Sequence, residues 1–283
     1  MNILFAGSPI SSAKVLDSLS NKAGLRIKAV ITQPDKRGKR GNKLVESQVA
    51  EKAKSLNIPL FKPTDLNDKY FKAELLSLDI EFLIVVAYGK LIPDWLIELP
   101  KITSINVHFS ILPKYRGASP IQSALLNADA ESGITIIKIN DELDSGDVYS
   151  SFVQIVDEDD DKISLENKLT ELCNANLFNV LKKINSNKLK ALPQDHSSAT
   201  YCNKVLKQDS EITFNDKSAD IINKFKAYIE WPGLTFKYKN TLIKIHGLKI
   251  TDEDSSSKAG TINKITKSGQ KLSITILTHF KTH

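Results

Sequence analysis

The sequence predicts an α/β protein with a doubly wound, mostly parallel sheet, followed by a smaller domain that resembles an OB-type β-barrel. Through the first two thirds of the chain, short apolar segments alternate with segments of helical periodicity. The run at 80–87 is almost continuously apolar, as expected for a central strand covered on both faces. Near residue 185 the pattern changes to closely spaced short strands with turn signals, which predicts the second domain.

The expected elements follow in chain order. The segments with strand patterns are 2–6, 26–31, 58–61, 80–87, 104–107, 133–139 and 148–155. Ser8 is placed to cap a first helix that Pro9 opens. The further segments with helical patterns are 46–56, 69–78, 119–127 and 164–184.

The chain after this region reads differently. A polar, proline-containing segment at 185–198 indicates a linker, and 218–228 has helical spacing. The segments with strand patterns are 234–239, 242–250, 260–266 and 272–277. We therefore predict a catalytic domain at 1–188, a linker at 189–203 and a barrel-like domain at 204–283.

Composition limits the class of protein. The hydrophobic fraction of 41% and the charged fraction of 25% are typical of globular proteins. The longest apolar run, 82–88, is far too short to span a bilayer, and the first residues read as a strand instead of a signal peptide. Cys173 and Cys202 have no metal-ligand spacing. We expect a cytoplasmic protein without disulfides, metal or membrane contact, in which Cys173 is a buried core residue.

The net charge of +6 is unevenly distributed. Residues 201–283 contain fourteen lysines, no arginine and eight acids, so that this segment carries the whole excess. Such an asymmetry suggests an anionic partner for the C-terminal segment. A solvated, lysine-rich surface explains it equally simply, and charge alone favours this second interpretation.

Polar side chains suited to acyl transfer follow three expected strands. The segments 87–91, 106–108 and 140–144 end such strands, and open parallel sheets bind ligands at the carboxyl ends of their strands. Asn106 and His108 are two residues apart, so on an extended strand both point to the same side. Acyl transfer to an amine needs donors for an oxyanion, which an amide and a protonated imidazole supply, and a group such as Asp144 to assist proton transfer.

A structural interpretation of the same residues stands beside this one. An Asn-x-His pair is common, and on spacing alone it is more often structural than catalytic. Asp144, in Leu-Asp-Ser-Gly-Asp, also suits a turn before a strand. The three residues alone therefore support a hypothesis only.

Two longer motifs carry a family resemblance. The run 106–122, Asn-Val-His-Phe-Ser-Ile-Leu-Pro-Lys-Tyr-Arg-Gly-Ala-Ser-Pro-Ile-Gln, closely resembles the signature of folate-dependent formyltransferases. The segment 133–147 resembles the second signature of that family. The resemblance implies a Rossmann-like catalytic domain, 10-formyltetrahydrofolate as formyl donor, and Asn106, His108 and Asp144 as catalytic residues.

Further segments resemble the branch of the family that formylates methionyl-tRNA for translation initiation. These are 5–9, with Ser8 where threonine is usual, 32–44, 86–89, 200–204 and 231–233. The resemblance implies folate contacts at Tyr88, Gly89, Lys90, Leu91, Ile92, Ser110, Leu112, Pro113, Asn140, Asp141, Glu142 and Leu143. It implies contacts with initiator methionyl-tRNA at Lys36, Arg37, Lys39, Arg40 and Lys43, because a basic, glycine-bearing loop neutralises phosphates and orders on binding. We expect a monomer.

Three alternatives remain open at this point. One is a sugar-nucleotide or ribonucleotide N-formyltransferase. Another is a formyltetrahydrofolate hydrolase with the same Asn/His/Asp site. The third is a non-catalytic RNA-binding protein on the same scaffold, against which the intact trio argues. The aromatic side chains of Trp231 and Phe236 suit base stacking, but we expect both in the core of the small domain.

The end of the chain departs from the family pattern. The resemblance extends from about residue 2 to about residue 260, and 272–283 does not resemble the family's usual ending of a hairpin and a helical motif. A truncation, a change of reading frame and a reduced natural variant all explain this. We therefore expect an incomplete barrel with an open edge of unpaired backbone groups.

Overall fold

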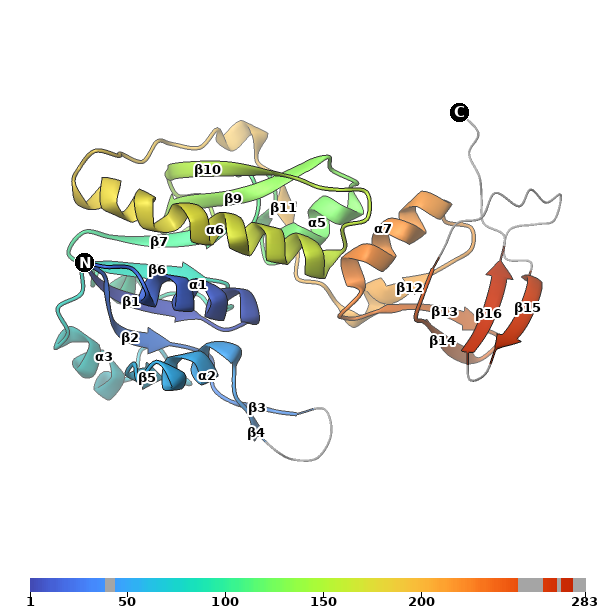
Figure 1. The fold of residues 1–283 in the computed structure, drawn as a ribbon, viewed down its shortest axis with the longest axis horizontal. Coiled ribbons are helices and arrows are strands. Elements are labelled where there is room, and N and C mark those ends of the chain that lie inside the picture. Colours follow the sequence, from blue (N-terminus) through green and yellow to red (C-terminus); the bar gives the residue numbers. More distant parts are fainter. Residues whose placement is uncertain (39–43, 249–261, 269–270, 277–283) are drawn as a thin grey trace. The chain divides into compact units, whose positions relative to one another are not determined.

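The computed structural model describes residues 1–38, 44–248, 262–268 and 271–276, the last two segments by their backbone. The chain divides into two compact units (Figure 1). Unit 1 comprises Met1–Pro120, Glu131–Val156 and Glu166–Asn203. Unit 2 comprises Ile121–Ala130, Asp157–Leu165 and Lys204–His283. The segment expected as a linker is thus part of the larger unit, and the domain limits at 188 and 204 remain our prediction.

A seven-stranded sheet forms the centre of unit 1, in the order β10-β9-β7-β6-β1-β2-β5 (Figure 1). Its strands, in chain order, are β1 (Asn2–Gly7), β2 (Arg26–Ile31), β5 (Leu60–Phe61), β6 (Phe82–Val86), β7 (Thr103–His108), β9 (Glu131–Lys138) and β10 (Val148–Ile155). Five neighbouring strands of the sheet, β7, β6, β1, β2 and β5, pair in parallel. Strand β9 is antiparallel to β7, and β10 is antiparallel to β9. The expected mostly parallel sheet is confirmed, with two antiparallel strands at one edge.

Two pairs of very short strands lie outside this sheet. Strands β3 (Lys36–Arg37) and β4 (Leu44–Val45) are antiparallel to each other within the basic loop. Strands β8 (Arg116–Gly117) and β11 (Tyr201–Cys202) pair in parallel. The second pair joins the first family motif to the segment just before Lys204, where the last part of unit 2 begins.

Helices cover both faces of the main sheet. The α-helices among the described residues are α1 (Ile10–Ser20), α2 (Gln48–Ser55), α3 (Lys69–Leu76), α4 (Asp94–Ile97), α5 (Pro120–Leu126), α6 (Lys162–Asn185) and α7 (Ser218–Tyr228). Leu4, Leu83 and Val85 share one core cluster with Phe71 and Leu75 of α3. The residues between them along the strands face the opposite side. On that opposite face, α1 and α6 cover the sheet (Figure 1), and a hydrogen bond from the Ser11 hydroxyl to the Glu166 carboxylate joins the two helices.

Local signals set several helix starts. Ser47 caps α2 by accepting a hydrogen bond from the Ala50 backbone, and the carboxylate of Asp68 caps α3. The expected cap of α1 by Ser8 is wrong. Pro9 itself is the N-cap residue and α1 begins at Ile10. The Ser8 hydroxyl instead donates to the backbone carbonyl of Tyr88, 3.2 Å away, because Ser8 lies beside the loop that follows β6.

Unit 2 contains a three-stranded sheet in the order β12-β13-β14 and a β15-β16 hairpin. The strands are β12 (Glu211–Ile212), β13 (Leu234–Tyr238), β14 (Thr241–Ile245), β15 (Ile262–Ser268) and β16 (Lys271–Ile276). Phe236 packs in a small core with Ile212, Ile221 and Leu234, as expected. Trp231 does not, since its side chain is 46% exposed. A small strand-rich second domain is thus confirmed, and the expected core position of Trp231 is wrong.

No helix in the described part of the chain is long and apolar enough to cross a membrane. Cys173 lies on α6 with no exposed surface, and both cysteines are free thiols. The expected core position of Cys173 is confirmed.

Candidate active site

Strand β7 and the loop after β9 bring the three candidate catalytic residues together. Asn106 and His108 lie near the carboxyl end of β7. Strand β9 runs the opposite way, with Lys138 beside Ile105, so its end lies away from His108. The loop 139–147 then turns back along the sheet and brings Asp144 to the end of β7. The prediction that the candidate residues follow the carboxyl ends of parallel strands is therefore confirmed for β6 and β7 and is wrong for β9.

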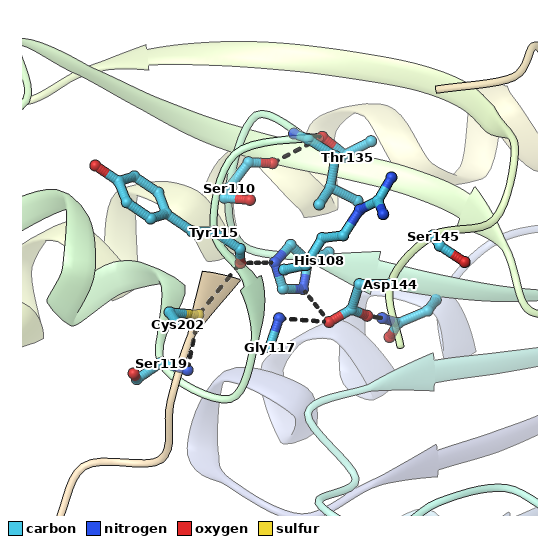
Figure 2. Close-up of polar contacts among 12 residues, drawn as sticks. His108, Ser110, Tyr115, Gly117, Ser119, Thr135, Asp144, Ser145 and Cys202 are labelled. Atoms are coloured by element: carbon cyan, nitrogen blue, oxygen red, sulfur yellow. Dashed lines mark hydrogen bonds and ion pairs between the residues drawn. The ribbon is translucent and has the colours of Figure 1, made fainter. Parts of the chain in front are cut away.

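The carboxylate of Asp144 is the meeting point of these segments (Figure 2). Its Oδ1 accepts a hydrogen bond from Asn106 Nδ2 at 3.1 Å. Its Oδ2 accepts one from the backbone N–H of Gly117 at 2.9 Å and faces His108 Nδ1 at 3.5 Å. The side chains of His108 and Asp144 are only 6% and 10% exposed, so water screens this contact little.

The imidazole of His108 faces an oxygen atom at each ring nitrogen. Nε2 lies 2.8 Å from the carbonyl oxygen of Tyr115, opposite the nitrogen that faces Asp144. The same carbonyl accepts a hydrogen bond from Cys202 Sγ at 3.2 Å (Figure 2). Each ring nitrogen of His108 therefore has an acceptor oxygen beside it. The contact with Asp144 is the longer one and exceeds an ordinary N–H···O distance.

The turn that carries Asp144 is tightly constrained. Asp144 has a left-handed backbone with φ of 51°, which is costly for a residue with a side chain. Two residues later, a Cβ on Gly146 would lie 1.8 Å from the carbonyl oxygen of Lys138, so only glycine fits. Ser145 is hydrogen-bonded to the amide of Asn140. The neighbours of this turn therefore hold it in a conformation that the chain alone disfavours.

The loop after β6 lies beside the same edge of the sheet. Ala87 and Gly89 both have left-handed backbones, with φ of 46° and 80°. The Tyr88 carbonyl between them accepts hydrogen bonds from Gln33 Nε2 at 2.7 Å and from Ser8. Burial raises the pKa of the Tyr88 phenol to about 12, and its hydroxyl has no hydrogen-bond partner among the described residues.

The residues expected to bind folate fall into two groups. Buried or partly buried are Tyr88, Lys90, Ile92, Ser110, Leu112 and Pro113, and exposed are Gly89, Leu91, Asn140, Asp141, Glu142 and Leu143. Leu91 is 84% exposed and Leu143 is 56% exposed, so the loops after β6 and β9 each present an apolar side chain to solvent. Lys90 is held by the carbonyl oxygens of Pro63 and Thr64.

The basic loop is only partly described. Lys36 and Arg37 are exposed on β3, whereas Lys39, Arg40 and Lys43 lie outside the described residues. The two ends of the loop converge on Lys62. Its Nζ lies 2.6 Å from Asp35 Oδ1 and 2.6 Å from Glu46 Oε1.

Three groups at the site carried no specific functional signal in the sequence. They are the carbonyl of Tyr115, the guanidinium of Arg116 and the amide of Gln194. Arg116 belongs to the first motif, but its burial, with only 2% of its surface exposed, is visible in the structure alone. Gln194 lies in a polar segment outside both family motifs. Among the described residues, no group of three or more histidine, cysteine or acidic side chains is placed to hold a metal.

Comparison with known protein families matches both parts of the chain. The formyl transferase model matches residues 1–181, and the model of the formyl transferase C-terminal domain matches residues 204–276. The chain belongs to the formyl transferase family. The second match reaches residue 276, so the expectation that the resemblance ends near residue 260 is wrong.

Curated members of the formyl transferase family are similar over most of their length. The methionyl-tRNA formyltransferase of Sulfurihydrogenibium sp. is 38% identical over 265 residues, which are 93% of this chain and 85% of that protein. The methionyl-tRNA formyltransferase of Kosmotoga olearia is 39% identical over 252 residues, 89% of this chain and 81% of that protein.

Solved structures show the same fold at low sequence identity. The N-formyltransferase from Helicobacter canadensis, solved with folinic acid and dTDP-3-aminofucose, has a TM-score of 0.67 at 20% identity and covers 97% of this chain and 95% of its own. Methionyl-tRNA formyltransferase from Clostridium thermocellum has a TM-score of 0.59 at 16% identity, with coverage of 98% and 97%. At these identities the likeness concerns the fold alone.

Proposed function

We propose that this chain transfers the formyl group of 10-formyltetrahydrofolate to the amino group of initiator methionyl-tRNA, in the cytoplasm, for translation initiation. The observation that carries the proposal is the identity of 38% and 39% to two methionyl-tRNA formyltransferases over more than four fifths of their length. The arrangement of Asn106, His108 and Asp144 agrees with the chemistry.

The reaction assigns a role to each of the three residues. The methionyl amine attacks the formyl carbon, a carbon–nitrogen bond forms, and the bond from that carbon to the folate nitrogen breaks. Asn106 and His108 are donors for the oxyanion of the tetrahedral centre, His108 through Nδ1, whose 3.5 Å contact with Asp144 is longer than the 2.8 Å contact of Nε2 with the Tyr115 carbonyl. Asp144 faces the imidazole and assists the movement of the proton from the attacking amine towards the departing folate nitrogen.

The substrate contacts remain as the sequence resemblance implies them. The folate residues are Tyr88, Gly89, Lys90, Leu91, Ile92, Ser110, Leu112, Pro113, Asn140, Asp141, Glu142 and Leu143. The exposed Leu91 and Leu143 support this proposal, because an organic ligand covers such side chains. For tRNA, we propose Lys36, Arg37, Lys39, Arg40 and Lys43. The exposure of Lys36 and Arg37 supports it.

The test is formyl transfer from 10-formyltetrahydrofolate to charged initiator methionyl-tRNA, with nucleotide sugars and water as parallel acceptors. We expect formylmethionyl-tRNA only. Transfer to a nucleotide sugar or to water would keep the catalytic trio and overturn the acceptor. RNA binding that weakens with salt, without turnover of any acceptor, would overturn the enzymatic proposal.

A further inference from the structure

Gln194 reaches the Asp144 turn from the polar segment before β11. Its side-chain amide nitrogen donates to the carbonyl oxygen of Asp144 at 2.9 Å and to that of Gly146 at 2.7 Å. The residue is 7% exposed, although its neighbours Pro193 and Asp195 are exposed. One side chain thus connects to the turn on both sides of Ser145.

Arg116 fixes which way this amide points. Its Nε and Nη2 lie 3.2 Å and 2.8 Å from Gln194 Oε1. A guanidinium has donors only, so the atom that faces it must be the amide oxygen, and the NH2 group must face the two carbonyls. The orientation of the Gln194 amide therefore follows from the donors and acceptors that surround it.

Arg116 is itself held in place. Its backbone N–H donates to the Thr200 carbonyl at 2.8 Å, and its Nη2 lies 3.1 Å from His196 Nδ1. Among the described residues no carboxylate lies within ion-pair distance of this buried guanidinium. The side-chain acceptors beside it in the described part of the chain are Gln194 Oε1 and His196 Nδ1, of which the Gln194 oxygen is the nearer at 2.8 Å.

The Asp144 turn needs such support. A left-handed aspartate persists only where its surroundings over-determine it. A shift of the turn would move the carboxylate away from Asn106, His108 and the backbone of Gly117 together. We propose that Gln194, oriented by Arg116, is a positioning residue that holds the turn at 144–146 so that the Asp144 carboxylate faces the other two catalytic residues. This inference rests on the proposed function.

Gln194→Glu separates positioning from stability. The carboxylate keeps the acceptor for Arg116 and adds an ion pair, but it removes both donors and repels the carbonyls of Asp144 and Gly146. We expect the melting temperature to be maintained, while kcat falls about 10- to 100-fold, as for a catalytic group displaced by about 1 Å. KM for both substrates should change less than about twofold. Gln154→Glu on β10 is the matched control, because within the described ranges its amide bonds only to the neighbouring Ile155 carbonyl.

A double-variant cycle distinguishes positioning from a general structural role. In single-turnover assays, Gln194→Glu should cost nothing further when Asp144 is already Asn, because there is no longer a catalytic carboxylate to position. An equal loss in both backgrounds, or a folded Gln194→Glu enzyme with unchanged kcat, would overturn the proposal. If Gln194→Glu does not fold, Gln194→Met, which also lacks the donors, takes its place. The cycle runs with whichever acceptor the wild type uses, so its failure is distinct from failure of the tRNA assignment.

Discussion

The carboxylate of Asp144 accepts hydrogen bonds from a side-chain amide and a backbone amide, and an imidazole faces one of the same oxygens. Every one of these partners suits a negative charge. An amide in its place would keep the volume but turn an NH2 group towards one of the donors. The chemistry of the site therefore depends on the charge and not only on the shape of this side chain.

Asp144→Asn should lower kcat for formyl transfer by about 10²- to 10⁴-fold, the range for loss of a general acid–base partner. Rapid-quench single-turnover assays measure this, with circular dichroism to verify the fold. Glu131→Gln, at an exposed position on β9, removes the same charge elsewhere and should leave the rate unchanged. Near-normal turnover of Asp144→Asn would refute the assigned mechanism.

The thiol of Cys173 is fully buried on α6, and burial raises its pKa to about 12. Because the ordinary value is 9.0, the folded state favours the neutral thiol. This contribution to stability is fully present below about pH 9 and is lost as the pH rises towards about 12. Between these pH values, the free energy of unfolding of Cys173→Ala, measured by urea denaturation, should depend less on pH than that of the wild type. A parallel pH dependence of both proteins would contradict this.

At the scale of elements, the basic loop has a defined base. Burial lowers the pKa of Lys62, but hydrogen bonds to Asp35 and Glu46 outweigh this and raise the pKa above its ordinary value. A hydrogen bond from Lys54, followed by that from Lys62, lowers the pKa of Glu46. The charges at both ends of the loop are therefore mutually stabilised.

Lys62→Met should loosen the base of the loop, since the charges of Asp35 and Glu46 then lose their shared partner. Hydrogen exchange by mass spectrometry should show faster exchange of the β3 and β4 amides, with little change in the rest of the sheet. Lys101→Met, which removes an exposed ion pair with Asp79, serves as control. Unchanged exchange at β3 and β4 would show that the strand pair does not depend on the ion pairs of Lys62 with Asp35 and Glu46.

Replacing Arg37, Lys39 and Arg40 with alanine should raise KM for methionyl-tRNA at least about tenfold, because three phosphate-neutralising charges are lost. The KM for 10-formyltetrahydrofolate should change little. Replacing Lys183, Lys188 and Lys190, all exposed, removes equal charge from another surface. Equal losses for both substrates would contradict the assignment of the loop to tRNA.

The sequence specifies the parallel strands well, because each is a compact apolar run whose burial admits few alternatives. Strand β10 and helix α7 have the expected bounds. The residue types of β9 do not indicate whether it runs parallel or antiparallel to β7. The path of the following loop, which brings Asp144 to His108, therefore cannot be predicted either. Gln194 is unpredictable for a related reason. A lone polar side chain in a polar segment acquires its role only through contacts some 50 residues away in sequence.

At the scale of the whole molecule, the excess positive charge belongs to the segment that forms most of unit 2. Lys207, Lys217 and Lys237 are exposed there. Lysines that contact phosphates bind polyanions through release of counterions, which makes the affinity depend steeply on salt.

Replacing these three lysines with glutamine should weaken tRNA binding and flatten its salt dependence. Filter binding between about 50 and 200 mM salt measures the slope of log K against log salt, which should fall by about 0.7 to 0.9 for each lost contact. Single-turnover chemistry at saturating tRNA should be unaffected. An unchanged slope would assign these lysines to ordinary solvated surface.

The pairing of β8 with β11 has a consequence for biosynthesis. A ribosome makes Asn106, His108 and Asp144 well before Gln194 and Cys202. The backbone carbonyl of Asp144 nevertheless accepts a hydrogen bond from Gln194, and His108 and Cys202 share the carbonyl of Tyr115 as a partner. A nascent chain that has emerged only to residue 188 therefore holds the complete trio without the residues that surround it. Folding of unit 1 can finish only after residue 203 has left the exit tunnel, so the catalytic site is completed when translation of the segment that begins at Lys204 is already under way.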